Sequence, residues 1–340
     1  MRPLHPQAEP NWTLPERKGR GNPTLSPFFP HGGRPSPRTL NTHTPKTAAP
    51  ATTYAAPATP APAPAPPSFT PIPEVVVGPA AWALAVEAGA AKAATPLGSP
   101  TVALGLLAGV CIGFGASLAF AVGGAVGGLA GGASPGLARA VFGLYGFPAG
   151  LLAIALLGGE LFTGNAFLFA AGAAEGRVAW RAALPRLAAV WVANGLGCAA
   201  VAAAMVAGGA PVLAGPGVAA AAAAKASLPL APAFARAVLC NILVCTAVLG
   251  ASAARSLPGK AVGILFPLSA FASLGLEHCI ANQFVFALAS LTGAPFSGAG
   301  ALANLAVVTA GNVVGGAGVL AGLMAVGHGS LGKKWRAASA

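Results

Sequence analysis

Two short stretches, GGELFTGN at residues 158–165 and GLEHCIAN at residues 275–282, interrupt long apolar runs of the chain. Each contains a glutamate followed five positions later by an asparagine, namely Glu160 and Asn165 in the first and Glu277 and Asn282 in the second. A carboxylate or an irregular backbone is costly at membrane depth unless it faces a water-filled or protein-lined cavity or is otherwise paired. The sequence therefore predicts two broken helices with polar breaks. For the two glutamates we favour a structural role, in which each accepts hydrogen bonds from amides of its own loop, over direct exposure to a passage.

The composition is that of a protein dissolved in lipid. Of the 340 residues, 55% are hydrophobic and 8% are charged, whereas about one quarter of an average soluble domain is charged. A helix needs about 20 residues to cross about 30 Å of hydrocarbon. Six apolar runs are long enough, near residues 101–127, 139–171, 184–208, 232–253, 261–290 and 301–326. We therefore predict an all-α, multi-pass membrane domain over residues 96–328.

The two breaks fall in the second and the fifth of these six spans, which are the middle spans of two three-span halves. Because each half has an odd number of spans, the two copies must lie in opposite orientations in the membrane. This arrangement is a 3+3 inverted-topology repeat.

The basic residues in the connections are distributed unevenly between the two sides of the membrane. One side takes Arg177, Arg181, Arg186, Arg255, Lys260, Lys333, Lys334 and Arg336. The other side takes Arg139 and Lys225, with Arg236 near the start of the fourth span. Positive charge gathers on the cytoplasmic side of membrane proteins, so we expect both termini there, or in the stroma of an organelle.

The N-terminal segment, residues 1–95, is expected to be disordered targeting and linker sequence. Residues 1–73 contain seven Lys or Arg against two Glu, with many Ser, Thr and Pro, and cannot bury enough apolar surface to fold. They lack the apolar core of a secretory signal but suit an organellar transit peptide, and their Ala and Pro bias is typical of algal chloroplast precursors. We expect the chloroplast envelope, with a plain cytoplasmic tail and the plasma membrane as the alternative. Residues 74–99 are expected to form an amphipathic stretch, and residues 329–340 a short basic tail.

His278 is the only histidine between His43 and His328, and it lies in the second break beside Glu277. An imidazole can exchange a proton near neutral pH, so a role in permeation is expected, although a buried neutral histidine bonded to a helix carbonyl is the alternative. The five cysteines lie in apolar stretches without the paired spacing of a zinc or redox site. We therefore expect no metal and no cofactor. The net charge of +12 does not form a basic patch interleaved with aromatics, which argues against a nucleic-acid partner.

Several stretches resemble the signature sequences of the formate/nitrite transporter family, in the order in which the family has them. They are PGLARAVFGL at 135–144, GELFTGN at 159–165, LCNILVC at 239–245, LEHCIAN at 276–282 and NLAVVTAGNVVGG at 304–316. The resemblance implies a homopentamer whose aquaporin-like protomers each carry a pore. It also implies transport of small monovalent anions such as nitrite and formate.

The resemblance assigns roles to particular residues. It makes His278 the central pore histidine, with Thr163 as its partner in the facing loop. Asn241 and Lys225 become polar groups of the vestibule on the far side from the termini, although Lys225 could instead extend to lipid headgroups. The implied constrictions are Phe147 and Phe271 on the far side, and Leu151, Leu161 and Phe162 on the side of the termini. Asn165 and Asn282 are expected to end the two breaks.

A bare anion loses its hydration in a dry constriction, so some group must offset its charge. We expect Lys225 to attract the anion and His278 to give it a hydrogen bond or a proton. These two versions describe a plain anion channel and a proton-coupled one. A channel for neutral solutes is the nearest rival, although the paired Asn-Pro-Ala boxes of that class are absent. An intramembrane enzyme using Glu160, Glu277 and His278 is not expected, because the chain has no Asp and no second histidine near His278.

Overall fold

The computed structural model describes residues 74–129, 135–210 and 216–338, which all belong to one compact unit spanning residues 68–340. Apart from short connections and one isolated β-bridge between Val75 and Ala254, these residues are helical. The first six helices are α1 (Pro79–Ala94), α2 (Ser99–Leu129), α3 (Pro135–Tyr145), α4 (Phe147–Leu157), α5 (Phe162–Ala174) and α6 (Trp180–Ala207). The next are α7 (Pro216–Ala226), α8 (Leu230–Ala253), α9 (Leu257–Ser273), α10 (Cys279–Leu291), α11 (Gly298–Val313), the π-helical η1 (Val314–Leu320), α12 (Ala321–Gly327) and α13 (Ser330–Ala338).

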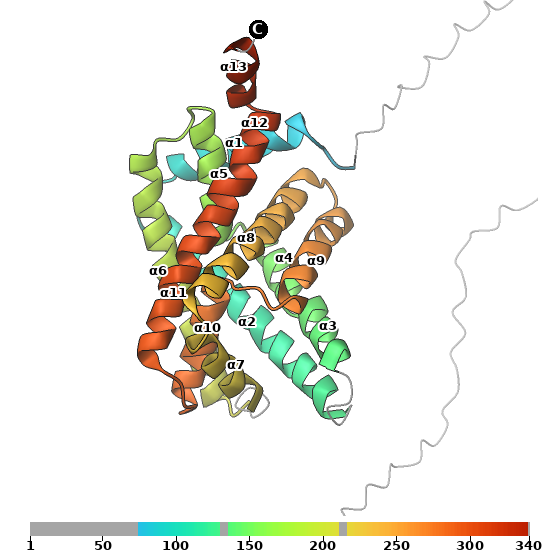
Figure 1. Cartoon of the computed structure of the whole chain (residues 1–340), viewed down its shortest axis with the longest axis vertical. Coiled ribbons are helices and arrows are strands. Elements are labelled where there is room, and N and C mark those ends of the chain that lie inside the picture. Colours follow the sequence, from blue (N-terminus) through green and yellow to red (C-terminus); the bar gives the residue numbers. More distant parts are fainter. Residues whose placement is uncertain (1–73, 130–134, 211–215, 339–340) are drawn as a thin grey trace, which may run out of the picture. The chain divides into compact units, whose positions relative to one another are not determined.

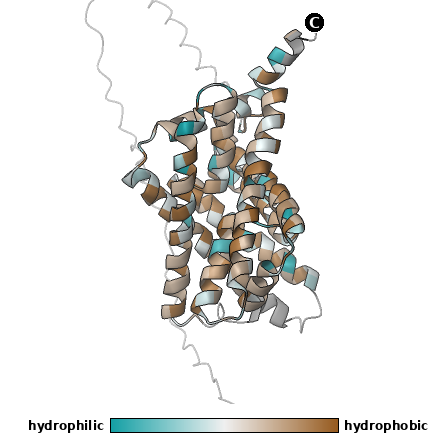
Figure 2. Ribbon diagram, turned by 60° about the vertical axis from the view of Figure 1, so that its left-hand side comes forward, coloured by the Kyte–Doolittle hydropathy of each residue, from teal (hydrophilic) through white to brown (hydrophobic). Residues whose placement is uncertain are grey.

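The long helices run together as a bundle, with α7 at one end and α13 at the other (Figure 1). Five helical segments are long and apolar enough to cross a membrane: Ser99–Gly123, Pro135–Leu157, Trp180–Ala207, Leu230–Ala253 and Gly298–Gly327. The sixth passage is made of α9 and α10, which are 17 and 13 residues long and so are each too short to span alone. Hydrophobic residues dominate the helices, with hydrophilic ones scattered at the ends and at a few inner positions (Figure 2).

Both predicted breaks are present, which confirms the expected fold. Helix α4 ends at Leu157 and α5 begins at Phe162, and α9 ends at Ser273 while α10 begins at Cys279. Gly158 and Gly275 follow the two half-helices with φ of 69° and 66°, a left-handed conformation that costs glycine little. The breaks are shorter than the quoted stretches. Asn165 and Asn282 therefore lie inside the first turns of α5 and α10 and do not end the breaks, because the helices resume before them.

The inverted repeat extends beyond the six spans. Helices α1 and α7 each precede the first span of a half, α2 and α8 are those spans, and α6 and α11 close the two halves. The pairs α2–α6 and α8–α11 approach at small residues, as membrane helices do. A Cβ atom added at Gly197 would lie 2.2 Å from the Leu106 carbonyl oxygen, and one added at Gly311 would lie 2.8 Å from that of Phe234. Each half is therefore held by a close helix pair.

Helix α1 belongs to the folded part, so the boundary expected at residue 95 was placed too late. Its buried positions Trp82, Ala85 and Val86 recur at helical spacing and pack in one cluster with Phe167 and Leu168 of α5. The rest of the expected targeting segment, residues 1–73, lies outside the described residues.

The described part of the chain begins and ends at the same end of the bundle (Figure 1), as an even number of passages requires. We call it the terminus side, and the opposite end the far side.

Candidate functional site

The first break is held by hydrogen bonds to three side chains. The Asn165 amide donates to Glu160 Oε2 over 2.5 Å, and the Lys92 ammonium of α1 lies 2.7 Å from Glu160 Oε1. Asn194 of α6 accepts from the Phe162 N–H over 2.9 Å and donates to the Glu160 carbonyl over 2.8 Å. A second donation, over 2.8 Å, reaches the Gly105 carbonyl of α2. The polar groups that the interruption of the helix leaves without helical partners are therefore paired with other groups inside the protein.

The second break repeats this network with different residues. The Asn282 amide donates to Glu277 Oε2 over 2.6 Å, and the Lys225 ammonium of α7 lies 2.9 Å from Glu277 Oε1. Asn312 of α11 accepts from the Cys279 N–H over 2.9 Å and donates to the Glu277 carbonyl over 3.0 Å. It also donates to the Ala237 carbonyl of α8 over 2.8 Å. Both glutamates thus bind groups that flank their own breaks, but the partners are an asparagine of the following helix and a lysine of another helix, and not the loop amides that were expected from the sequence.

Sequence reasoning missed three members of these networks. Lys92 fell in the segment assigned to linker, and Asn194 and Asn312 were not selected as site residues. The sequence did contain a signal for the asparagines. Each is an amide next to glycine within the apolar last span of a half, in Ala-Asn-Gly at 193–195 and Ala-Gly-Asn at 310–312. No comparable signal marked Lys92, whose partner lies 68 positions further along the chain.

His278, in the second break, contacts Thr163, which follows the first break. His278 caps the N-terminus of α10, where its Nδ1 accepts the Ala281 N–H over 3.1 Å. Nδ1 therefore carries a lone pair, and the neutral ring has its proton on Nε2. Nε2 lies 3.0 Å from Thr163 Oγ1, so it donates to that hydroxyl. Thr163 belongs to the first turn of α5 and not to the loop, which corrects its expected location.

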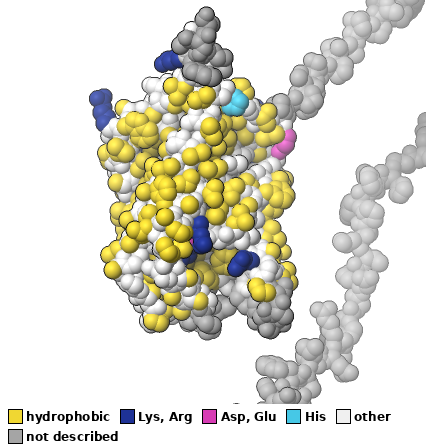
Figure 3. Space-filling model, viewed as in Figure 1, with side chains coloured by type: hydrophobic (Ala, Val, Ile, Leu, Met, Phe, Trp, Pro, Cys, Tyr) yellow, Lys and Arg dark blue, Asp and Glu magenta, His cyan; other side chains and the backbone are white. Residues whose placement is uncertain are grey.

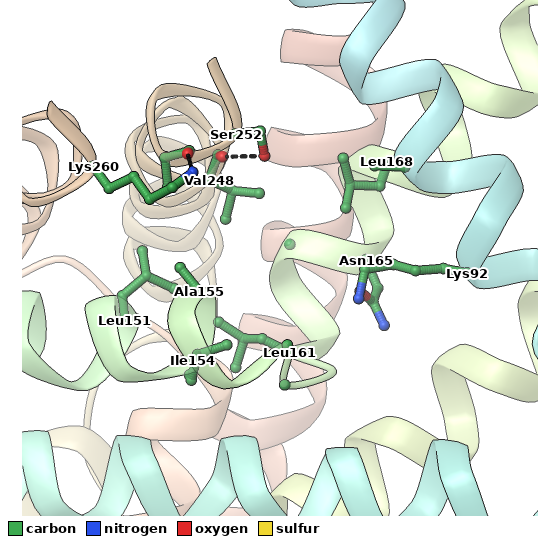
Figure 4. A pocket seen from close by; sticks show the side chains of 15 residues that line it. Lys92, Leu151, Ile154, Ala155, Leu161, Asn165, Leu168, Val248, Ser252 and Lys260 are labelled. Carbon is green, nitrogen blue, oxygen red and sulfur yellow. Dashed lines mark hydrogen bonds between the residues drawn. The ribbon is translucent and has the colours of Figure 1, made fainter. Parts of the chain in front are cut away.

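Three cavities with shared walls lead past this pair. The far-side cavity, of about 360 Å³, is lined by Lys225, Glu277 and His278 among others. A central chamber of about 10 Å³ follows, also lined by His278. The terminus-side cavity, of about 210 Å³, is lined by Lys92, Asn165 and further residues. Figure 4 shows Lys92 and Lys260 extending toward it from different helices.

Apart from His278, the residues shared by neighbouring cavities are apolar. Phe147 and Phe271 line both the far-side cavity and the chamber, and their ring centroids are 5.3 Å apart. Leu151 and Leu161 line both the chamber and the terminus-side cavity. These four residues stand where the sequence expected constrictions.

Phe162, the fifth residue expected at a constriction, lies elsewhere. It lines an apolar groove of about 400 Å³ with Trp191, Val313 and other residues, and lines none of the three cavities. Leu161, which precedes α5 with extended backbone, lines the chamber, whereas Phe162, the first residue of that helix, lines the groove.

Asn241 also departs from its expected place in the far vestibule. It is fully buried and donates to the carbonyls of Thr163, over 3.2 Å, and of Asn312, over 2.7 Å. An amide in the middle of a packed span must find partners within the protein, and these two carbonyls supply them. Asn241 therefore connects the two halves of the repeat and does not line the far-side cavity.

Outside the membrane-spanning segments, Glu175 joins three elements on the terminus side. Its Oε1 accepts from the Trp82 indole over 3.1 Å and from the Ser330 N–H over 2.9 Å. Burial raises the pKa of this carboxyl, but hydrogen bonds from Ser330 and Trp82 and the charge of Lys333 outweigh burial, so the pKa lies below its ordinary value. Glu175 thus ties α13 to α1, the helix that carries Lys92.

Within the described ranges, no group of three or more His, Cys, Asp or Glu side chains could hold a metal ion. The five cysteines are free and buried. The site is therefore built from apolar walls, two lysine–glutamate pairs and one histidine.

Comparison with known proteins agrees with this construction. A family model described as formate/nitrite transporter matches residues 80–326. A probable formate transporter of Methanothermobacter thermautotrophicus is 37% identical over 243 residues, covering 66% of this chain and 87% of that protein. The formate channel FocA of Haemophilus influenzae is 30% identical over 237 residues, covering 63% and 81%.

Two solved structures are also similar. An FNT family ion channel superposes with a TM-score of 0.62 at 27% identity, covering 76% of this chain and 97% of that one. A pentameric formate channel with formate bound superposes with a TM-score of 0.55 at 28% identity, covering 66% and 94%.

Proposed function

Since the chain belongs to the formate/nitrite transporter family, whose members are transporters and channels and not enzymes, we propose that it conducts small monovalent anions, formate and nitrite among them. The names of its relatives support formate, and the family description supports nitrite. The observation that carries the proposal is the succession of cavities, in which two wide vestibules are separated by a small apolar chamber whose one polar lining side chain is His278.

The apolar walls explain selectivity for small, weakly hydrated ions. An anion passing Phe147 and Phe271 loses most of its water, which is unfavourable unless a donor replaces that water. The chamber of about 10 Å³ has no room for a hydration shell. His278 is the polar side chain that lines the chamber, and Thr163 accepts its hydrogen bond.

We propose that His278 acts as a hydrogen-bond donor from Nε2 and not as a proton donor. Its Nδ1 is occupied by the Ala281 N–H, so a second ring proton would break the cap of α10. A neutral imidazole that gave away its Nε2 proton would become an imidazolate, which is too basic to form near neutral pH. This geometry supports the plain anion channel over the proton-coupled version.

Oligomeric state is the second part of the proposal. A similar structure is named a pentameric formate channel, and large apolar side chains such as Leu184, Val192 and Leu196 are exposed on α6. The face drawn in Figure 3 is mostly apolar, with few charged side chains. We propose a homopentamer, which would give a particle mass five times that of the 32.7-kDa chain in light scattering.

The compartment is the third part. We propose that residues 1–73 carry an address to the chloroplast envelope, because the family match begins only at residue 80 and the preceding sequence is basic and rich in Pro. Sequencing the mature N-terminus from native tissue tests this proposal. An intact Met1 on protein isolated from the plasma membrane would refute it.

The decisive experiment measures formate and nitrite flux into liposomes. His278→Asn retains an acceptor for the Ala281 N–H, but its shorter amide carries its N–H donors on an atom that does not reach the position of Nε2, so we expect flux to fall about tenfold or more while the pentamer persists. The matched control is His328→Asn, which alters a histidine outside the three cavities. Unchanged flux in His278→Asn would remove His278 from permeation. An uncharged solute that crosses as fast as formate would favour a neutral-solute channel instead.

A further inference from the structure

The charges around the far-side cavity do not act equally. Three side chains of fixed charge line it: Arg139 of α3, Lys225 of α7 and Glu277. Lys225 and Glu277 form an ion pair of 2.9 Å whose members are 20% and 4% exposed. The field of such a pair is that of a dipole and decays rapidly with distance. Lys225 therefore contributes little net attraction to an approaching anion, in contrast to the role expected from the sequence.

Arg139 is placed differently. It is exposed on α3, and among the described residues no carboxylate lies within 4.0 Å of its guanidinium. Residues 130–134 and 211–215, which lie outside the described ranges, contain no charged residues. Among the described residues that line this cavity, Arg139 is thus the positive charge without a carboxylate partner.

We propose that Arg139 supplies the electrostatic attraction that concentrates anions in the far-side vestibule, while Lys225 and Glu277 hold the second break. This inference rests on the proposed anion channel and identifies the group that recruits its substrate. A cavity with one sign of net charge and apolar walls raises the local concentration of the opposite ion. Phe120, Phe142 and Phe147 supply such walls next to Arg139.

The terminus-side cavity also has a lysine–glutamate pair. Its second cation, Lys260, is balanced by nearby polar groups to a greater extent than Arg139 is. Lys92 is bound to Glu160 over 2.7 Å. The Lys260 ammonium donates to the carbonyls of Ala251 and Ala254, over 2.7 and 2.9 Å, where the C-terminus of α8 carries partial negative charge. The recruiting charge is therefore expected to matter more on the far side.

The test compares Arg139→Gln with Arg236→Gln in the full chain reconstituted in liposomes. Arg236 is a matched control because it is also an exposed arginine on the far side but does not line the cavity. One charge at about 7 Å in an effective dielectric of about 40–80 changes local anion concentration about two- to eightfold. We expect Arg139→Gln to lower formate and nitrite flux by that factor at about 10 mM salt, and the difference to vanish at about 1 M potassium sulfate. Arg139→Lys should conduct like the wild type.

The outcomes separate the two proposals. Absence of anion flux in wild-type liposomes would overturn the proposed channel itself. Flux in the wild type together with equal flux in Arg139→Gln and Arg236→Gln at low salt would overturn the role of Arg139 and leave the channel intact. Equal losses in Arg139→Gln at low and high salt would likewise overturn an electrostatic role. Light scattering of each variant checks that the assembly is unchanged.

Discussion

Replacing Asn194 by Ala tests whether the breaks depend on the spans that close each half. The variant loses three hydrogen bonds, to the Phe162 N–H, the Glu160 carbonyl and the Gly105 carbonyl. All three partners stay behind in the protein interior without a replacement. We therefore expect a loss in the free energy of unfolding and a displaced first break.

The magnitude follows from the number of bonds. An interhelical hydrogen bond within a membrane contributes about 0.6 kcal/mol on average and up to about 1.7 kcal/mol. A buried group left without a partner costs about 1–3 kcal/mol. Three hydrogen bonds at about 0.6–1.7 kcal/mol each give an expected loss of about 2–5 kcal/mol. Asn312→Ala should lose a similar amount, because its three bonds are equivalent.

Equilibrium unfolding in mixed micelles of mild detergent and SDS, followed by circular dichroism, measures this loss. Thr246→Val is the matched control, since the exposed Thr246 hydroxyl bonds only to the Ile242 carbonyl of its own helix and should change stability by less than about 0.5 kcal/mol. A loss for Asn194→Ala no greater than that of Thr246→Val would refute the reasoning and would mean that the break is held by Glu160 alone.

Two further predictions concern packing and pH. Gly197→Ala should destabilise the protein by about 1–3 kcal/mol, because its Cβ would lie 2.2 Å from the Leu106 carbonyl oxygen. Gly98→Ala is the control, since a Cβ there has no atom within 4 Å, and it should not destabilise the protein. Thermal unfolding in detergent compares the two variants. The pKa of Glu175 is lowered in the folded protein. The ionised carboxylate therefore stabilises the contact with Ser330 fully at pH values above the ordinary pKa of a glutamate. This stabilisation is lost as the pH falls through the pKa that Glu175 has in the folded protein. Proteolysis of the C-terminal helix should therefore accelerate in acid, and Glu175→Gln should abolish that acceleration.

Glu87→Gln is the control for the pH prediction. Glu87 lies on the same side of the membrane and pairs with Arg177 over 2.8 Å, but both side chains are exposed, and exposed pairs contribute little. Acid-accelerated proteolysis that persists in Glu175→Gln would contradict the role given to Glu175.

The sequence predicted the features of the site that lie within one short stretch of the chain, but not the contacts between residues that are far apart in the sequence. The positions of the breaks, the glutamate–asparagine pairs and the isolated His278 could be found because each signal lies within eight consecutive residues. Lys92, Asn194 and Asn312 could not be assigned because their partners come from other helices, and no short pattern encodes that proximity.

Direction around a helix was the other source of error. Phe162 and Asn241 were expected to face the pathway, but Phe162 lines an outer groove and Asn241 bonds to two carbonyls inside the bundle. A one-residue uncertainty in where a helix starts rotates every side chain by about 100°. The sequence alone does not define helix starts to that accuracy, so these directions could not be predicted.

Asn241 has a consequence for how substrate could cross. Its single amide nitrogen joins Thr163 of one half to Asn312 of the other. A carrier that rocks one half against the other would have to break both hydrogen bonds in every cycle, at a side chain that is fully buried. A route that stays open at one fixed angle between the halves, in which only side chains move aside, avoids that cost. The flux through such a route should keep rising with the concentration gradient, to rates above those of rocking carriers.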